Sequence, residues 1–122
     1  MIIIGHKLIE SESLYEVKDV DSIAQTLPNS TVLVKFSKKN LKILNFCKKH
    51  SIKFAVGVKN LTQIALVNSF NPKYILVKKK LSLDAQKFAD DYLIDAKILL
   101  ISNSYSQIEF VAKNSIDGII FK

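Results

Sequence analysis

The sequence predicts a single α/β domain, residues 1–122, built on a mostly parallel sheet. Four segments, 51–58, 71–77, 94–101 and 115–121, each hold a short, nearly continuous apolar run that follows a turn-like residue. Runs rich in β-branched and aromatic side chains are typical of strands buried on both faces, as in parallel sheets. From Val34 onward the centres of the predicted strands recur every 20–24 residues, and helical periods lie between them. This alternation of strand and helix predicts right-handed crossovers.

Two further apolar runs, Ile2–Ile4 and Thr31–Phe36, bring the predicted strands to about six. Pro72 opens one of the strands, where its missing N–H costs least. The stretch from Gly5 to Val17 is ambiguous, and within it we expect Leu14–Val17 to pair locally as a small antiparallel strand.

Apolar residues spaced for one face of a helix predict five helices. The predicted stripes are Val20, Ile23, Ala24 and Leu27; Leu41, Ile43, Leu44 and Cys47; Leu61, Ile64, Ala65 and Asn68; Leu81, Ala85, Phe88, Ala89 and Tyr92; and Ile108, Val111 and Ala112. Residues that favour helix N-caps precede several of them. These are Ser37, Asn60 with Gln63 three residues later, Ser82, and Ser104 with Gln107.

About six strands are too few for an eight-stranded barrel, which takes about 250 residues. Two architectures fit the strand number. The first expectation is an open, doubly wound sheet, and the alternative is a half (βα) barrel, which could complete itself as a homodimer.

Residues 52–121 resemble the later strand–helix units of phosphate-binding (βα) barrels, whose units have a similar length. The ending Ile116-Asp-Gly-Ile-Ile-Phe121 is similar to strands near the end of such barrels. The resemblance implies topology and no particular activity. Those barrels bind phosphate with Gly-rich loops, whereas the three glycines here, Gly5, Gly57 and Gly118, all lie near or within strands.

The charge distribution is the strongest indication of a ligand. Residues 22–83 contain twelve lysines and no Asp or Glu, whereas residues 1–21 sum to −3 and residues 84–122 to −2. All eighteen basic residues are Lys, in a chain that is also rich in Ile, Asn and Phe. A general bias in amino-acid usage therefore explains the preference for Lys over Arg, but it does not explain why this segment lacks Asp and Glu. This basic segment is either an anion-binding surface or a solvated face without function.

Ligands of parallel α/β sheets bind beyond the carboxyl ends of the strands. Lysines and hydroxyl or amide side chains gather at the predicted ends, where free N–H groups of helices also favour anions. We therefore expect an anionic, phosphorylated ligand to bind there. The predicted ligand-binding residues are Ser37, Lys38, Lys59, Asn60, Lys78 and Ser104.

A nucleic acid is the alternative partner, bound without sequence preference through segment 35–80. Lys38, Lys42 and Lys49 share one predicted helix face that could follow a phosphate backbone. Without Arg the chain lacks the usual bidentate base contacts. No aromatic-rich strand motif predicts base stacking.

A barrel-like enzyme acting on a phosphorylated metabolite is the second alternative, although we expect a binding protein. The candidate catalytic residues are His6, at a strand end, and Lys35, whose amine could form a Schiff base if desolvated. The residue spacings predict no metal site, because neither histidine has ligands at a suitable distance. No phosphate-binding loop or dinucleotide fingerprint occurs, and we expect no cofactor.

The remaining composition predicts a cytoplasmic protein without a membrane partner. The longest apolar runs are too short to span a bilayer, and Met1–Ile4 lacks the charged region and cleavage site of a signal peptide. The single cysteine, Cys47, falls on the apolar side of a predicted helix and is expected to be a buried thiol.

Overall fold

A computed structural model describes residues 1–25 and 30–122. Its centre is one sheet of seven strands, all parallel, in the order β1-β7-β6-β5-β4-β3-β2. The strands are β1 (Ile2–Ile4), β2 (Leu14–Glu16), β3 (Thr31–Lys35), β4 (Phe54–Gly57), β5 (Tyr74–Val77), β6 (Lys97–Ser102) and β7 (Gly118–Phe121). From β2 to β7 each strand pairs with the next in sequence, and β1 pairs with β7, so the chain ends lie in adjacent strands.

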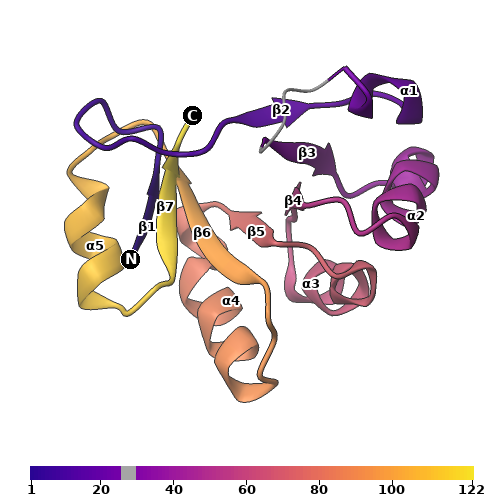
Figure 1. The fold of residues 1–122 in the computed structure, drawn as a ribbon. Helices are drawn as coiled ribbons and strands as arrows, with labels where there is room; N and C mark the ends of the chain where they lie inside the picture. The colour runs from indigo at the N-terminus through magenta and orange to yellow at the C-terminus, as the bar shows by residue number, and fades with distance from the viewer. Residues whose placement is uncertain (26–29) are drawn as a thin grey trace.

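Five α-helices connect or precede these strands within the described residues. They are α1 (Val20–Ile23), α2 (Leu41–Lys49), α3 (Leu61–Val67), α4 (Lys79–Asp91) and α5 (Gln107–Lys113), with short 3-10 turns at Lys38–Asn40 and Asn68–Phe70. Figure 1 shows the helices arranged around the outside of the sheet. None of the described helices is long and apolar enough to cross a bilayer.

The two faces of the sheet have different cores. The buried apolar side chains of all five helices pack in one cluster against the outer face, around residues such as Val34, Val56 and Ile98. The inner face carries a second cluster made only of strand residues, with Leu33, Leu76 and Leu99 at its centre. Among the described residues, no helix side chain joins this inner cluster, and its members are buried because the sheet curls around them.

The fold is therefore the half-barrel, and the single α/β domain with a parallel sheet is as the sequence predicts. The doubly wound arrangement is not formed, because it needs helices on both faces and a reversal of strand order. The expected antiparallel pairing of Leu14–Val17 is wrong. Leu14–Glu16 forms β2, which pairs in parallel with β3 and becomes one edge of the sheet.

Each predicted helix stripe contributes buried side chains to the outer core, but some of its members are exposed. Ile64, Cys47 and Val111 are buried as expected, whereas Leu41, Ala65 and Tyr92 are exposed. The predicted position of Leu27 lies outside the described residues. Cys47 is a buried free thiol, as predicted from sequence, and this burial raises the pKa of the thiol to about 11.

The predicted helix caps have mixed outcomes. Asn60 caps α3 by accepting a hydrogen bond from the Gln63 N–H at 2.9 Å. Ser82 is wrong as a cap, because α4 begins at Lys79 and the Ser82 hydroxyl donates to the Lys79 carbonyl inside the helix. Ser104 lies before α5, where its carbonyl accepts from the Gln107 N–H and its hydroxyl contacts that of Ser106.

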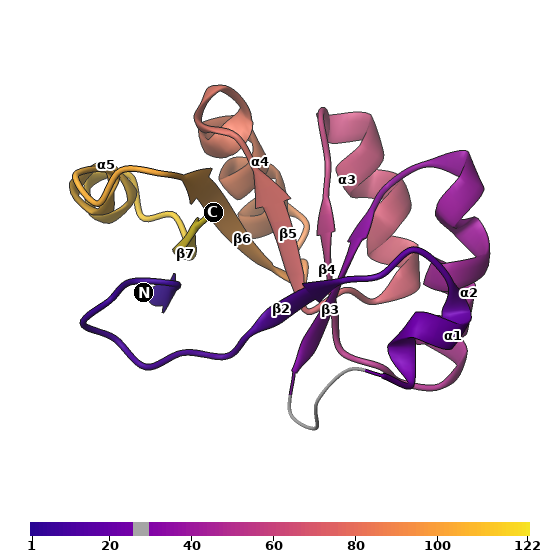
Figure 2. The same ribbon diagram turned by 90° about the horizontal axis from the view of Figure 1, so that it is seen from above.

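Residues 5–13, here called the connecting segment, join the two edge strands β1 and β2 without a helix. Figure 2 shows the segment as a wide arc between these strands. Its turn begins at Gly5, whose φ of +87° favours glycine, and the Gly5 N–H donates to the Ser11 hydroxyl at 3.1 Å. At its end, the Ser13 carbonyl accepts from the Thr31 N–H at 3.1 Å. The connecting segment thus links β1 and β2, the two edge strands of the curled sheet.

Candidate binding cleft and polar cluster

A cleft of about 690 Å³ opens where the predicted ligand edge lies, at the carboxyl ends of β3, β4, β5 and β6. Apolar and basic side chains share its lining. The lining residues are Lys35, Phe36, Ser37, Lys39, Gly57, Val58, Lys59, Gln63, Leu76, Lys78, Lys80, Leu81, Asp84 and Ile101. The position of the cleft follows from the parallel sheet, because the loops that follow parallel strands all lie at the same edge.

The first wall of the cleft is the turn after β3. The Phe36 N–H donates to the Gly57 carbonyl at 3.3 Å, which extends the pairing of β3 with β4 by one bond. Asn40 then donates from its side-chain amide to the Lys35 carbonyl at 2.8 Å and holds the 3-10 turn against the strand end. The Ser37 hydroxyl oxygen is buried there without a hydrogen-bond partner among the described residues, so the predicted side-chain cap is not formed.

The second wall is the turn between β4 and α3. Gln63 accepts from the Lys59 N–H through its side-chain oxygen at 2.8 Å while its own N–H is capped by Asn60. The first bond fixes the backbone at Lys59, and the second commits the Asn60 side chain to the helix cap. Gln63 and Lys59 therefore line the cleft, and Asn60 does not.

The third wall is the start of α4. Lys78 precedes this helix of 13 residues, and no side chain caps its N-terminus. Lys78 and Lys80 line the cleft, whereas Lys79 between them turns to the other side and places its ammonium 4.7 Å from the centre of the Phe110 ring. The helical turn thus separates three consecutive lysines into two that face the cleft and one that packs against α5.

Five lysines meet at this cleft: Lys35, Lys39, Lys59, Lys78 and Lys80. Their side chains are exposed, and the ion pairs found among the described residues involve none of them. Of the described residues that line the cleft, only Asp84, on the second turn of α4, carries a carboxylate. The cleft therefore concentrates positive charge that the protein itself does not neutralise.

The structure brings together only part of the predicted site. Ser37, Lys59 and Lys78 line the cleft, together with Lys35, which the sequence offered as a catalytic amine. Lys38, Asn60 and Ser104 are outside it. Sequence reasoning missed Lys39, Lys80, Gln63, Gly57 and Asp84. Lys39 and Lys80 belong to the lysine runs that marked the strand ends, but a run does not reveal which of its members turns inward.

The candidate catalytic residues lie in different surroundings. Lys35 is exposed at the end of β3, which gives its amine no desolvated setting. His6 is not in the cleft lining; its ring lies 4.0 Å from that of Tyr105 and 5.8 Å from that of Phe121, measured between centroids. The His6 Nδ1 accepts from the Leu8 N–H at 3.0 Å, so the imidazole helps to fold the connecting segment.

The lysines that suggested nucleic-acid binding are exposed on the outside of the half-barrel, with Lys42 and Lys49 in α2 and Lys38 in the 3-10 turn before it. A hollow beside them is lined by Lys18, Lys39 and Lys42 but also by Asp19 and Asp21 from the start of α1. These two carboxylates come from the acidic first 21 residues and interrupt the positive surface that the second helix shows in sequence.

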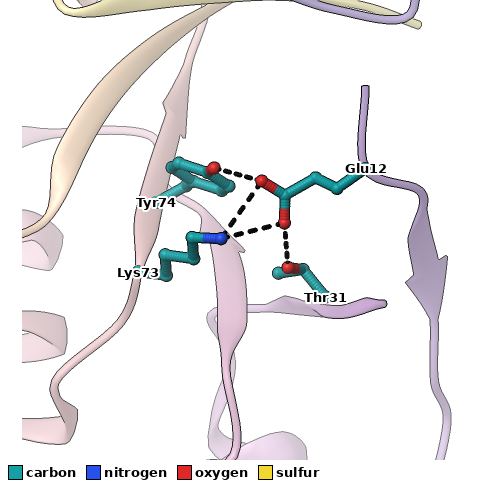
Figure 3. Close-up of polar contacts among 4 residues, drawn as sticks. All are labelled: Glu12, Thr31, Lys73 and Tyr74. Atoms are coloured by element: carbon teal, nitrogen blue, oxygen red, sulfur yellow. Dashed lines mark hydrogen bonds and ion pairs between the residues drawn. The ribbon is translucent and has the colours of Figure 1, made fainter. Parts of the chain in front are cut away.

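A polar cluster lies at the opposite, amino-terminal edge of the sheet (Figure 3). Glu12 of the connecting segment accepts hydrogen bonds from the hydroxyls of Thr31 and Tyr74, at the starts of β3 and β5. The Lys73 ammonium lies 3.1 Å from both Glu12 carboxylate oxygens. Thr31 and Tyr74 are buried, so Glu12 reaches under the inner core. No sequence signal marked this cluster, since Glu12 and Lys73 are 61 residues apart.

The cluster shifts the ionisation of its members. Burial alone would raise the pKa of Glu12, but the hydrogen bonds from Thr31, Tyr74 and Lys73 together hold it below its usual value. Burial and the neighbouring Glu12 carboxylate raise the pKa of Tyr74. The pKa of Lys73 is raised in spite of partial burial, because Glu12 and Tyr74 stabilise the ammonium. Near neutral pH the cluster is therefore an ion pair with a neutral phenol.

Among the described residues no group of three or more His, Cys, Asp or Glu is placed to hold a metal ion. The sequence matches no protein-family model, and no curated protein matches it significantly. Function is therefore inferred from the geometry of the cleft.

Proposed function

We propose that this protein binds an anionic ligand carrying a phosphate group in the cleft at the carboxyl ends of β3–β6. The observation that carries the proposal is the convergence on one concave site of five lysines, none of which is in an ion pair within the described part of the chain. Ammonium groups held close together repel one another, and a phosphate with one to two negative charges would relieve that repulsion and accept charge-assisted hydrogen bonds.

The cleft is a better anion site than the α2 surface for two reasons. It is concave, so its lysines act on one bound group, whereas the α2 lysines are spread along the outside. Its lining contains one carboxylate, Asp84, whereas the hollow beside α2 contains Asp19 and Asp21. Nonspecific binding of a nucleic-acid backbone therefore remains the alternative of lower support.

Binding is also better supported than catalysis. The lining that the described residues form includes no histidine and no cysteine, and the lysine proposed as a Schiff-base amine is exposed. A nucleophilic lysine needs a lowered pKa, which requires a desolvated or otherwise perturbed environment.

The test compares phosphate with chloride in thermal unfolding. Millimolar phosphate should raise the melting temperature above that in sodium chloride of the same ionic strength, because phosphate binds the folded state preferentially. The double variant Lys59→Gln/Lys78→Gln should lose most of this difference. Lys53→Gln, at an exposed position near the other edge of the sheet, should keep it. Equal shifts in phosphate and chloride would show general screening and refute the site.

A further inference from the structure

The size of the cleft indicates more than an inorganic anion. Sites for organic ligands enclose about 300–1,000 Å³. The cleft, at about 690 Å³, falls within that range, and a phosphate at the lysines would leave much of it unfilled.

The unfilled part has an apolar floor. Val58, Leu76, Leu81 and Ile101 line it from three strands or their ends and from α4. Lysine side chains can extend their ammonium groups to the rim of such a cleft while their aliphatic stems cover its walls. The cleft therefore has two chemically distinct parts, a cationic rim and an apolar floor, and a ligand that fills both must be amphipathic.

Gly57 is central to this floor and is not explained by the fold. It is paired with Lys35 on one side and Leu76 on the other. Among the described glycines only Gly5 has a positive φ, so the backbone at position 57 suits any residue. A Cβ added at Gly57 would meet no heavy atom within 4 Å. Glycine weakens a strand and commonly marks a place where a ligand approaches the backbone closely.

We propose that the ligand is a phosphate monoester with a flat, apolar body, which lies over Gly57 while its phosphate meets the lysine rim. This inference rests on the proposed function and adds the class of the organic body. Glycine at position 57 leaves the backbone open to a ring, which packs between the Lys35 stem and Leu76. A polyol body, as in a sugar phosphate, would leave its hydroxyls against an apolar floor and bind less well.

The experiment measures dissociation constants by calorimetry at one ionic strength for three probes: inorganic phosphate, phenyl phosphate and glucose 6-phosphate. Phenyl phosphate should bind the parent protein at least about tenfold more tightly than inorganic phosphate, because the ring is removed from water. Glucose 6-phosphate should gain little over inorganic phosphate.

Gly57→Ala and Gly57→Val then test the position. The preference for phenyl phosphate over inorganic phosphate should shrink with alanine and disappear with valine, while the affinity for inorganic phosphate stays within about twofold, because the lysines are unchanged. The alanine variant serves the test even if valine disturbs the strand. Ala65→Val, on an exposed part of α3 outside the cleft lining, should leave both affinities unchanged.

The outcomes separate the two proposals. If inorganic phosphate and phenyl phosphate both fail to bind, the proposed function is wrong, and this inference is wrong with it. If phosphate binds but phenyl phosphate binds no better, or keeps its advantage in Gly57→Val, only the assignment of the apolar body over Gly57 is refuted.

Discussion

Lys73, at the amino-terminal edge of the sheet, and the cleft lysines, at the carboxyl-terminal edge, differ in whether a carboxylate neutralises them. At the amino-terminal edge, Lys73 forms an ion pair with both carboxylate oxygens of Glu12, beside the Thr31 and Tyr74 hydroxyls (Figure 3). At the carboxyl-terminal edge, Lys59, Lys78 and the other lysines of the cleft have no carboxylate partner among the described ion pairs. Among the described residues, the charge of Lys73 is thus paired within the protein, whereas the charges of the cleft lysines are not.

This difference separates stability from binding. At the amino-terminal edge, Glu12 fixes the connecting segment beneath the inner core. A saturated cluster of this kind has little remaining capacity for a ligand. The carboxyl-terminal edge holds lysines that repel one another above an apolar floor. The buried strands below the floor keep the sheet folded in spite of this repulsion. Unneutralised charge in a concave site is a reason to look for a ligand of opposite charge.

The largest expected effect compares two strand glycines, one near each edge. In β7, a Cβ on Gly118 would lie 2.4 Å from the Ile2 carbonyl oxygen and 2.7 Å from a Leu99 methyl carbon. Gly118→Ala should therefore lower the free energy of unfolding by about 3 kcal/mol, since crowding at backbone cannot be relieved by a side-chain rotation. In denaturant unfolding, Gly57→Ala should be neutral or stabilising by up to about 1 kcal/mol. Similar losses in both would contradict the open space assigned to Gly57.

An intermediate effect is expected from Glu12→Gln. The substitution keeps the shape of the side chain but leaves Lys73 without its counter-charge and weakens the bonds to both hydroxyls. The free energy of unfolding at pH 7 should fall by about 2 kcal/mol, as for hydrogen bonds to a charged group. Glu10→Gln, at an exposed position of the connecting segment, should change it by less than about 0.5 kcal/mol.

The pH dependence checks that the loss comes from the Glu12 charge. The pKa of Glu12 is lowered in the folded protein, so its contribution is fully present above the unfolded value of about 4.3. The contribution is lost as pH falls through the folded pKa, because the unfolded chain takes up the proton more readily. The stability gap between the parent and Glu12→Gln should therefore be constant from pH 5 to 8 and close below pH 4. A gap that persists in acid would indicate packing instead.

The smallest effect concerns lysines at the two edges. Lys80 lies in the first turn of α4, where a positive charge costs about 0.3–1 kcal/mol at low ionic strength. Without added anion, Lys80→Gln should raise the free energy of unfolding slightly, and about 0.5 M salt should remove the gain. Lys73→Gln should lower it, because Glu12 loses its partner. A loss of stability in Lys80→Gln would show that Lys80 already has a partner in the folded protein.

Part of the cleft could be predicted because strand ends in a parallel sheet share an edge. Strand periodicity placed the turns after β3, β4 and β5 together, and hence Ser37, Lys59 and Lys78. It could not predict Lys79, which lies between two cleft lysines and faces Phe110, since the rotation of a helix on its sheet comes from packing. Asn60 was correctly predicted as a helix cap, and that bond is what keeps its side chain from the site.

The sequence by itself determined the domain, the parallel strands from Thr31 onward and the segregation of charge, because these depend on local periodicity and composition. Only the tertiary structure decided that the sheet curls with all helices outside, because strand order depends on contacts between distant residues. The same holds for β2, which pairs in parallel with β3, and for Glu12, which reaches Lys73 across 61 positions of sequence. Gly57 and Gly118 have similar sequence contexts, since each lies in an apolar strand. Their neighbours in space make one a crowded contact and the other an open floor.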